Sequence, residues 1–185
     1  MKLFEEILRQ SMPVLFLCIF GEILAGLFLT NIQEYLNVLP GIIILVPAVM
    51  GTRGNILGTV STRLTSGLHI GTIYPRFRKN PVLSTNIKAG FLMSIIISFI
   101  TGVVAHFACV SLGFQSMGIV KFSLISLMAG FMADASLILL SVFICFFSFK
   151  KNIDPDNIII PTITTISDFM SVLFLLISVH IVQAI

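Results

Sequence analysis

One carboxylate, Asp168, lies in a long apolar segment near the end of the sequence, beside several hydroxyl side chains. In a helix, Thr164 and Thr165 lie four and three residues before it and Ser171 three after it, so they share its face. Carboxylate and hydroxyl oxygens are what hard cations such as Mg²⁺ and Ca²⁺ require, and no cluster of histidine and cysteine favours zinc or copper. We therefore predict a divalent-cation site at Asp168, with Thr164 and Thr165 beside it. The alternative is a carboxylate that joins helices by a hydrogen bond to a neighbouring serine or threonine.

Three further residues are candidates for the same site. Gly54 lets the backbone approach closely, and the amide oxygen of Asn55 can coordinate an ion. Asn55 could instead be a polar clamp that satisfies backbone groups freed by a break in its helix. Asp134 has apolar neighbours, and both a transport role and an ion pair, for example with Arg53, remain open.

Other ionisable residues in apolar segments have structural explanations. We expect Glu22 to pair with a basic residue rather than to bind the ion. Arg53 would repel a cation, so it either points to an acidic partner or lies near a mouth of the path. The three histidines, His69, His106 and His180, lie on different predicted elements, so we expect no metal site shared among them.

Membrane-spanning helices must position these residues, because the composition excludes an ordinary soluble domain. The chain of 185 residues is 57% hydrophobic and only 10% charged, against about 25% charged in soluble domains. A spanning helix needs about 20 mostly apolar residues. Five segments qualify, which predicts an all-α integral membrane protein with one transport domain over residues 1–185. The predicted spans are residues 12–30, 38–68, 89–113, 122–149 and 157–185.

The second predicted span is too long for a simple crossing. A helix over residues 38–68 would be about 46 Å long, whereas the hydrocarbon core is about 30 Å thick. Either this helix is long, tilted and protruding, or it is broken near residues 51–55, where glycines are frequent. The third and fifth helices have clearer starts, since Asn80 and Asp154 each precede a proline, as an N-cap does.

Basic residues are distributed unevenly between the two sides of the predicted bundle. Eight of them lie before the first span or after the second and fourth spans, and only Lys121 lies on the other side. The positive-inside rule therefore predicts a cytoplasmic N-terminus.

Two stretches carry a resemblance to a known family. The segment LVPAVMGTRGN (residues 45–55), followed by STRL and HIG, resembles the second span of the MgtE family and of its eukaryotic solute-carrier relatives. The segment DPDNIIIPTITTISD (residues 154–168) resembles the start of that family's last span. The resemblance implies a homodimeric Mg²⁺ channel or carrier whose pore is lined by the second and fifth spans, with Asp168, Thr164, Gly54 and Asn55 at the family's site positions.

The sequence also departs from that family. Bacterial members have a cytoplasmic N-domain and a CBS pair that sense Mg²⁺, whereas about 11 residues precede the first span here. We expect no such regulatory domain, so that gating is absent or supplied by a subunit in trans. Ile160 stands where bacterial members have a polar residue, and Arg53 where they have a small one.

The expected function is transport of Mg²⁺, or of another divalent cation, across the plasma membrane through a pore at a dimer axis. Asp168 and the Thr164 carbonyl would hold a mostly hydrated ion, because Mg²⁺ loses water reluctantly. The protein is expected to lie in a lipid bilayer and to bind no nucleic acid. The alternatives are an exchanger coupled to Na⁺ or H⁺ and a non-transporting membrane subunit. An aspartyl protease using Asp134 and Asp168 is disfavoured because neither residue has the Gly-x-Gly-Asp element, so we expect no enzyme.

Overall fold

The computed structural model describes the backbone of residues 2–37 and 41–184 and the side chains of residues 4–30 and 41–184. This part of the chain contains five helices and no strand. The helices are α1 (Lys2–Asn37), α2 (Ile42–Ile70), α3 (Pro81–Ser111), α4 (Ile119–Lys150) and α5 (Pro155–Gln183). Each is long and apolar enough to cross a membrane. The prediction of an all-α, multi-pass membrane protein is therefore confirmed.

The starts of α3 and α5 agree with the predicted caps. Asn80 Oδ1 accepts hydrogen bonds from the backbone N–H groups of Val82 at 2.9 Å and Leu83 at 3.1 Å. Asp154 Oδ1 accepts one from the N–H of Asp156 at 3.1 Å. These side chains satisfy donors that a helix start leaves without partners. Because the cap comes before the apolar run, α3 begins eight residues before the predicted span at residue 89.

Helix α2 is continuous, so a break near residues 51–55 is wrong and the long helix is correct. The helix continues through Pro47 and all of its glycines until Gly71, whose left-handed conformation (φ +79°) ends it. At ~1.5 Å per residue it is about 44 Å long. The predicted start of this span at residues 38–40, and the predicted end of the last span at residue 185, lie outside the described residues.

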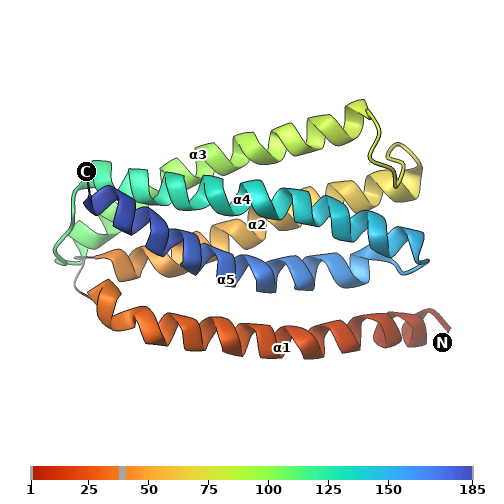
Figure 1. Cartoon of the computed structure of the whole chain (residues 1–185), viewed down its shortest axis with the longest axis horizontal. Coiled ribbons are helices and arrows are strands. Elements are labelled where there is room, and N and C mark those ends of the chain that lie inside the picture. The colour runs from red at the N-terminus through yellow and green to blue at the C-terminus, as the bar shows by residue number, and fades with distance from the viewer. Residues whose placement is uncertain (1, 38–40, 185) are drawn as a thin grey trace.

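The helices form a bundle in which α1 lies on the outside (Figure 1). Helix α1 packs mainly against α5, and α5 also packs against α2 and α4. The N-terminus and the α2–α3 and α4–α5 connections lie at one end of the bundle, and the C-terminus lies at the other (Figure 1). The basic connections thus share the end of the N-terminus, which is the arrangement that the predicted cytoplasmic N-terminus requires.

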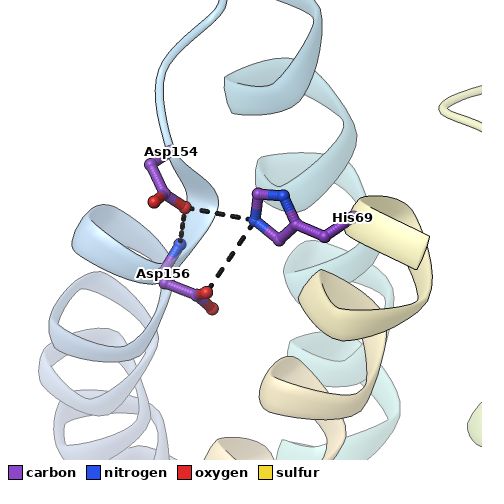
Figure 2. Close-up of side chains that lie close together, drawn as sticks. All are labelled: His69, Asp154 and Asp156. Atoms are coloured by element: carbon purple, nitrogen blue, oxygen red, sulfur yellow. Dashed lines mark hydrogen bonds and ion pairs between the residues drawn. The ribbon is translucent and has the colours of Figure 1, made fainter. Parts of the chain in front are cut away.

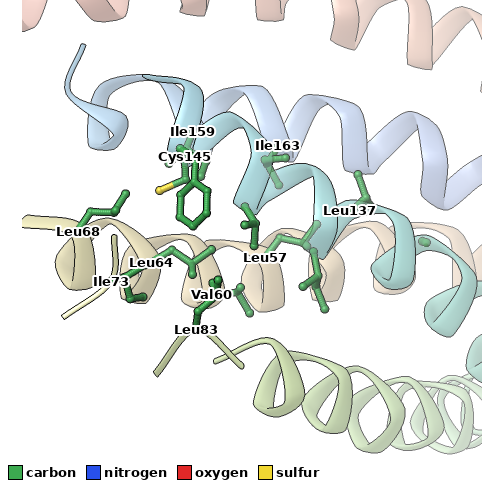
Figure 3. Packing of buried hydrophobic residues seen from close by; sticks show 14 residues of the cluster. Leu57, Val60, Leu64, Leu68, Ile73, Leu83, Leu137, Cys145, Ile159 and Ile163 are labelled. Carbon is green, nitrogen blue, oxygen red and sulfur yellow. The ribbon is translucent and has the colours of Figure 1, made fainter. Parts of the chain in front are cut away.

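Buried apolar side chains form two clusters along the bundle. One joins the first half of α2 to the first part of α4 and the last part of α5, for example through Leu45, Ile125 and Val179. The other joins the second half of α2 to the second half of α4 and the start of α5, for example through Leu64 and Ile159 (Figure 3). The candidate site residues of α2 and α5 lie between these clusters in sequence, and Asp134 of α4 directly follows Ala133, where the second cluster begins on that helix. The fold therefore places the candidate site residues at a middle level of the bundle.

Candidate functional site

A buried ion pair joins α2 to α4 at this level. Arg53 Nη1 lies 3.0 Å from Asp134 Oδ2, and both side chains are 0% exposed. The other guanidinium nitrogen, Nη2, donates to Ser98 Oγ of α3 at 2.8 Å. The structure thus gives Arg53 the acidic partner that was one of its two expected roles. Because Asp134 is neutralised within the chain, its geometry favours a structural role over ion binding.

The ion pair fits only because α4 has a glycine beside it. A Cβ added at Gly130 would overlap the Arg53 guanidinium and the Ser98 hydroxyl. Arg53 Nε and Asp134 Oδ1 are buried without a hydrogen-bond partner in the described part of the chain. This pair therefore holds three helices together through close packing and charge, with some polar groups left unsatisfied.

The predicted site residues of α5 lie on the side where α1 and α2 approach it. Thr164 faces α2, since a Cβ added at Gly54 would lie 3.7 Å from its methyl carbon. Its hydroxyl donates to the backbone oxygens of Ile160 and Pro161, at 3.0 Å each. The lone pairs of that hydroxyl can still accept a hydrogen bond or coordinate an ion. The Thr164 carbonyl, expected to contact the ion, already accepts a hydrogen bond from Ser167 Oγ at 2.8 Å.

Thr165 and Asn55 lie on either side of this position. Thr165 faces α1, because a Cβ added at Gly21 would overlap its methyl group. Asn55 follows Gly54 on α2, and its side chain is exposed. Since α2 has no break here, Asn55 does not act as a clamp for freed backbone groups. Its amide remains available to an ion or to water.

Asp168 is partly buried, and Glu22 of α1 is an ionisable neighbour. The two carboxyl groups interact electrostatically, and they repel each other when both are charged. Among the side chains that the structure describes, no ion pair includes either residue. The expected pairing of Glu22 with a basic residue is therefore not found among the described side chains. The position of Glu22 between two glycines of an apolar segment gave no sign of which helix it would meet.

A second group of possible ligands lies at the N-terminal end of the bundle, and sequence analysis missed it. His69 Nε2 lies 3.3 Å from Asp154 Oδ1 and 3.8 Å from Asp156 Oδ2 (Figure 2). The side chains of His69, Asp154 and Asp156 are 46%, 45% and 52% exposed, so water competes for all three. The signal was available in the sequence, because the end of the second span and the start of the fifth lie on the same side of the membrane.

Comparisons with known proteins place the chain among transporters. The model of the MgtE family, described as a divalent cation transporter, matches residues 46–178. Solute carrier family 41 member 2 of Gallus gallus is 26% identical over 164 residues, which cover 84% of this chain and 28% of that protein. Solute carrier family 41 member 3 of Rattus norvegicus is 23% identical over 168 residues, covering 88% of this chain and 36% of the relative. The chain thus spans about a third of the length of these relatives.

Proposed function

This chain belongs to the MgtE family of divalent cation transporters, and from that premise we propose that it carries Mg²⁺ across the plasma membrane. The path is a pore at the two-fold axis of a homodimer, lined by α2 and α5. The main support is the environment of Asp168. It is an acidic residue at the middle level of a spanning helix, partly exposed, and no basic residue among the described side chains pairs with it.

The neighbouring groups suit a hard, hydrated cation. Thr164, Thr165 and Asn55 supply hydroxyl and amide oxygens, and Gly54 leaves the α2 surface beside Thr164 without a side chain. Mg²⁺ keeps several of its waters when it binds to proteins. In the proposed site the Asp168 carboxylate attracts the ion and offsets part of its charge, and the other oxygens accept hydrogen bonds from its water shell. The Thr164 carbonyl, which already accepts the Ser167 hydroxyl, plays the smaller part.

A homodimer completes the path. Five helices with α1 on the outside leave the site residues at the surface of one protomer, where Asn55 is exposed. A two-fold axis would place identical patches of α2 and α5 face to face. The facing patches would enclose water and bring two copies of Asp168 toward the same passage.

Reconstituted flux tests this function. The purified chain in liposomes should admit Mg²⁺ to an internal fluorescent indicator, and Asp168→Asn should abolish that uptake while the variant remains folded. Asp156→Asn, which also removes a carboxylate from α5 but at its exposed start, is the matched control and should retain uptake. Normal uptake by Asp168→Asn would remove this residue from the mechanism, and no flux by the wild-type chain would favour a non-transporting subunit.

The same liposomes separate a pore from an exchanger. A membrane potential alone should drive Mg²⁺ through the proposed pore. Uptake that occurs only with a Na⁺ or H⁺ gradient would replace the pore by a coupled exchanger.

A further inference from the structure

Two adjoining cavities lie where the α2–α3 connection meets the start of α3, at the basic end of the bundle. One, of about 520 Å³, lies within the connection and is lined by residues between Tyr74 and Asn80. The other, of about 680 Å³, follows the first turns of α3 as far as Phe91. Because Arg78, Lys79 and Asn80 line both, the two cavities meet at these residues and form one groove, the α3 groove.

The two parts of the α3 groove have different walls. The part within the connection is lined by basic side chains and by Tyr74, so its hydrogen-bond donors are N–H and O–H groups. The part along α3 adds an apolar wall of Leu83, Ile87 and Phe91, which are spaced four residues apart and therefore share one face of the helix. A ligand that fits both parts has an anionic head and an apolar tail.

The basic side chains of the α3 groove are available to such a head. None of the ion pairs among the described side chains includes them. The first N–H groups of α3 already donate to Asn80 Oδ1, so side chains rather than the helix start must hold the head. An arginine guanidinium matches two oxygens of a phosphate at once, and a lysine adds a further charge. The basic residues of the groove are all exposed; they are Arg76, Arg78, Lys79 and Lys88.

The level of the α3 groove in the bilayer indicates the source of the phosphate. Helix α3 has no Asp, Glu, Lys or Arg after Lys88, so this residue marks where the helix enters the hydrocarbon, and Phe91 lies just beyond it. From Pro81 to Lys88 the helix rises about 10 Å, which is comparable with the about 5–8 Å of polar headgroups on each side of a bilayer. The groove therefore leads from the headgroup layer into the acyl chains, as a phospholipid does.

We propose that the α3 groove binds an anionic glycerophospholipid. The phosphate lies between Arg78 and Lys79, and one acyl chain lies along Leu83, Ile87 and Phe91. The groove is at the end of the bundle that the positive-inside rule assigns to the cytoplasm, and anionic lipids give the cytoplasmic leaflet its negative charge. This inference concerns the lipid around the chain and does not depend on which ion is carried.

A single tryptophan tests the lipid preference of the groove. The chain has no tryptophan, so Phe91→Trp supplies one reporter at the acyl end. In vesicles of equal parts phosphatidylglycerol and phosphatidylcholine, bromine on the chains of one lipid at a time quenches the reporter according to how often that lipid occupies the groove. A basic residue near an anionic lipid contributes about fivefold, so phosphatidylglycerol should be preferred at least about fivefold. Leu92→Trp, at the same depth but outside the groove lining, is the matched control and should show a much smaller preference.

Charge variants in the Phe91→Trp background separate the groove from the general charge of this end. Arg78→Gln with Lys79→Gln should lower the preference to that of the Leu92→Trp control. Lys150→Gln with Lys151→Gln removes the same charge from the α4–α5 connection at the same end of the bundle and should leave the preference unchanged (Figure 1). An equal loss in both double variants would overturn the proposal, as would equal preferences at the two reporters.

Melting of the wild-type chain in detergent distinguishes a lipid from a free phosphate. Dihexanoyl phosphatidylglycerol should raise the melting temperature, because a ligand that binds only the folded chain stabilises it. Dihexanoyl phosphatidylcholine and inorganic phosphate at the same concentration should not. An equal shift with phosphatidylcholine would mean that the groove takes any lipid, and an equal shift with inorganic phosphate would mean that it binds the free anion. Either result would overturn the assignment.

Discussion

The two acidic side chains at the middle level of this bundle, Asp134 and Asp168, have opposite surroundings. Asp134 lies 3.0 Å from the guanidinium of Arg53, and neither side chain is exposed. Asp168 is partly exposed and lies beside a second carboxylate, that of Glu22. The first region is a closed pair with its own counter-charge, whereas the side chains that the structure describes give the second, open pair no counter-charge.

This difference separates two uses of charge within a membrane. An ionisable residue in a span is costly, and position in the sequence does not show how the cost is offset. Around Asp134 the chain supplies the balancing charge, so the acid becomes part of the packing. Around Asp168 the described side chains supply no such charge, and in the proposed function a mobile ion or proton supplies it.

The largest expected effect on stability follows from breaking the ion pair between Arg53 and Asp134. Asp134→Asn should lower the free energy of unfolding by about 3–5 kcal/mol, because Arg53 is left buried without its counter-charge. Denaturant titration of the purified protein in detergent measures this change. Asp168→Asn should leave the midpoint of unfolding near that of the wild type. An equal loss of stability in both variants would erase the distinction between the two regions.

Removing both charges of the Arg53–Asp134 pair tests whether its role is structural only. Arg53→Met combined with Asp134→Leu should be more stable than either single variant, because no unpaired charge remains in the core. The double variant should also retain Mg²⁺ uptake. If uptake is lost in a double variant that is folded, Asp134 or Arg53 takes part in transport after all.

The sequence predicted the elements of this fold better than the partners of its charged residues. Length and apolar composition were enough for five helices, and local cap chemistry was enough for the starts at Asn80 and Asp154. The continuity of α2 was not predictable from its glycines, because packing against α3, α4 and α5 stabilises the helix through them. The Arg53 pair was anticipated only as an alternative. The meeting of Glu22 with Asp168 depends on the register between α1 and α5, which is a tertiary property.

Two glycines offer a smaller and more selective test, because each lies beside one of the two regions. Gly130→Ala should destabilise the protein by about 1–3 kcal/mol, since the new methyl group overlaps the Arg53 guanidinium. Gly21→Ala meets only the end of the Thr165 side chain, which can move, so its main effect should be a shift of α1 on α5. We expect reduced Mg²⁺ affinity with a nearly unchanged unfolding midpoint for Gly21→Ala. The reverse pattern in the two variants would contradict the assignment of one region to stability and the other to the ion.

The smallest effect on stability is expected at the solvent-exposed contact of His69 with Asp154 and Asp156. His69 lies 3.3 Å from Asp154, but both side chains are nearly half exposed. His69→Ala should therefore change the free energy of unfolding by less than about 1 kcal/mol. Denaturant titrations of His69→Ala and Asp134→Asn under the same conditions measure the contrast, and Mg²⁺ uptake by His69→Ala should stay close to that of the wild type. A loss of stability as large as that of Asp134→Asn would mean that burial does not determine the strength of these pairs, because both have similar contact distances and differ mainly in exposure to solvent.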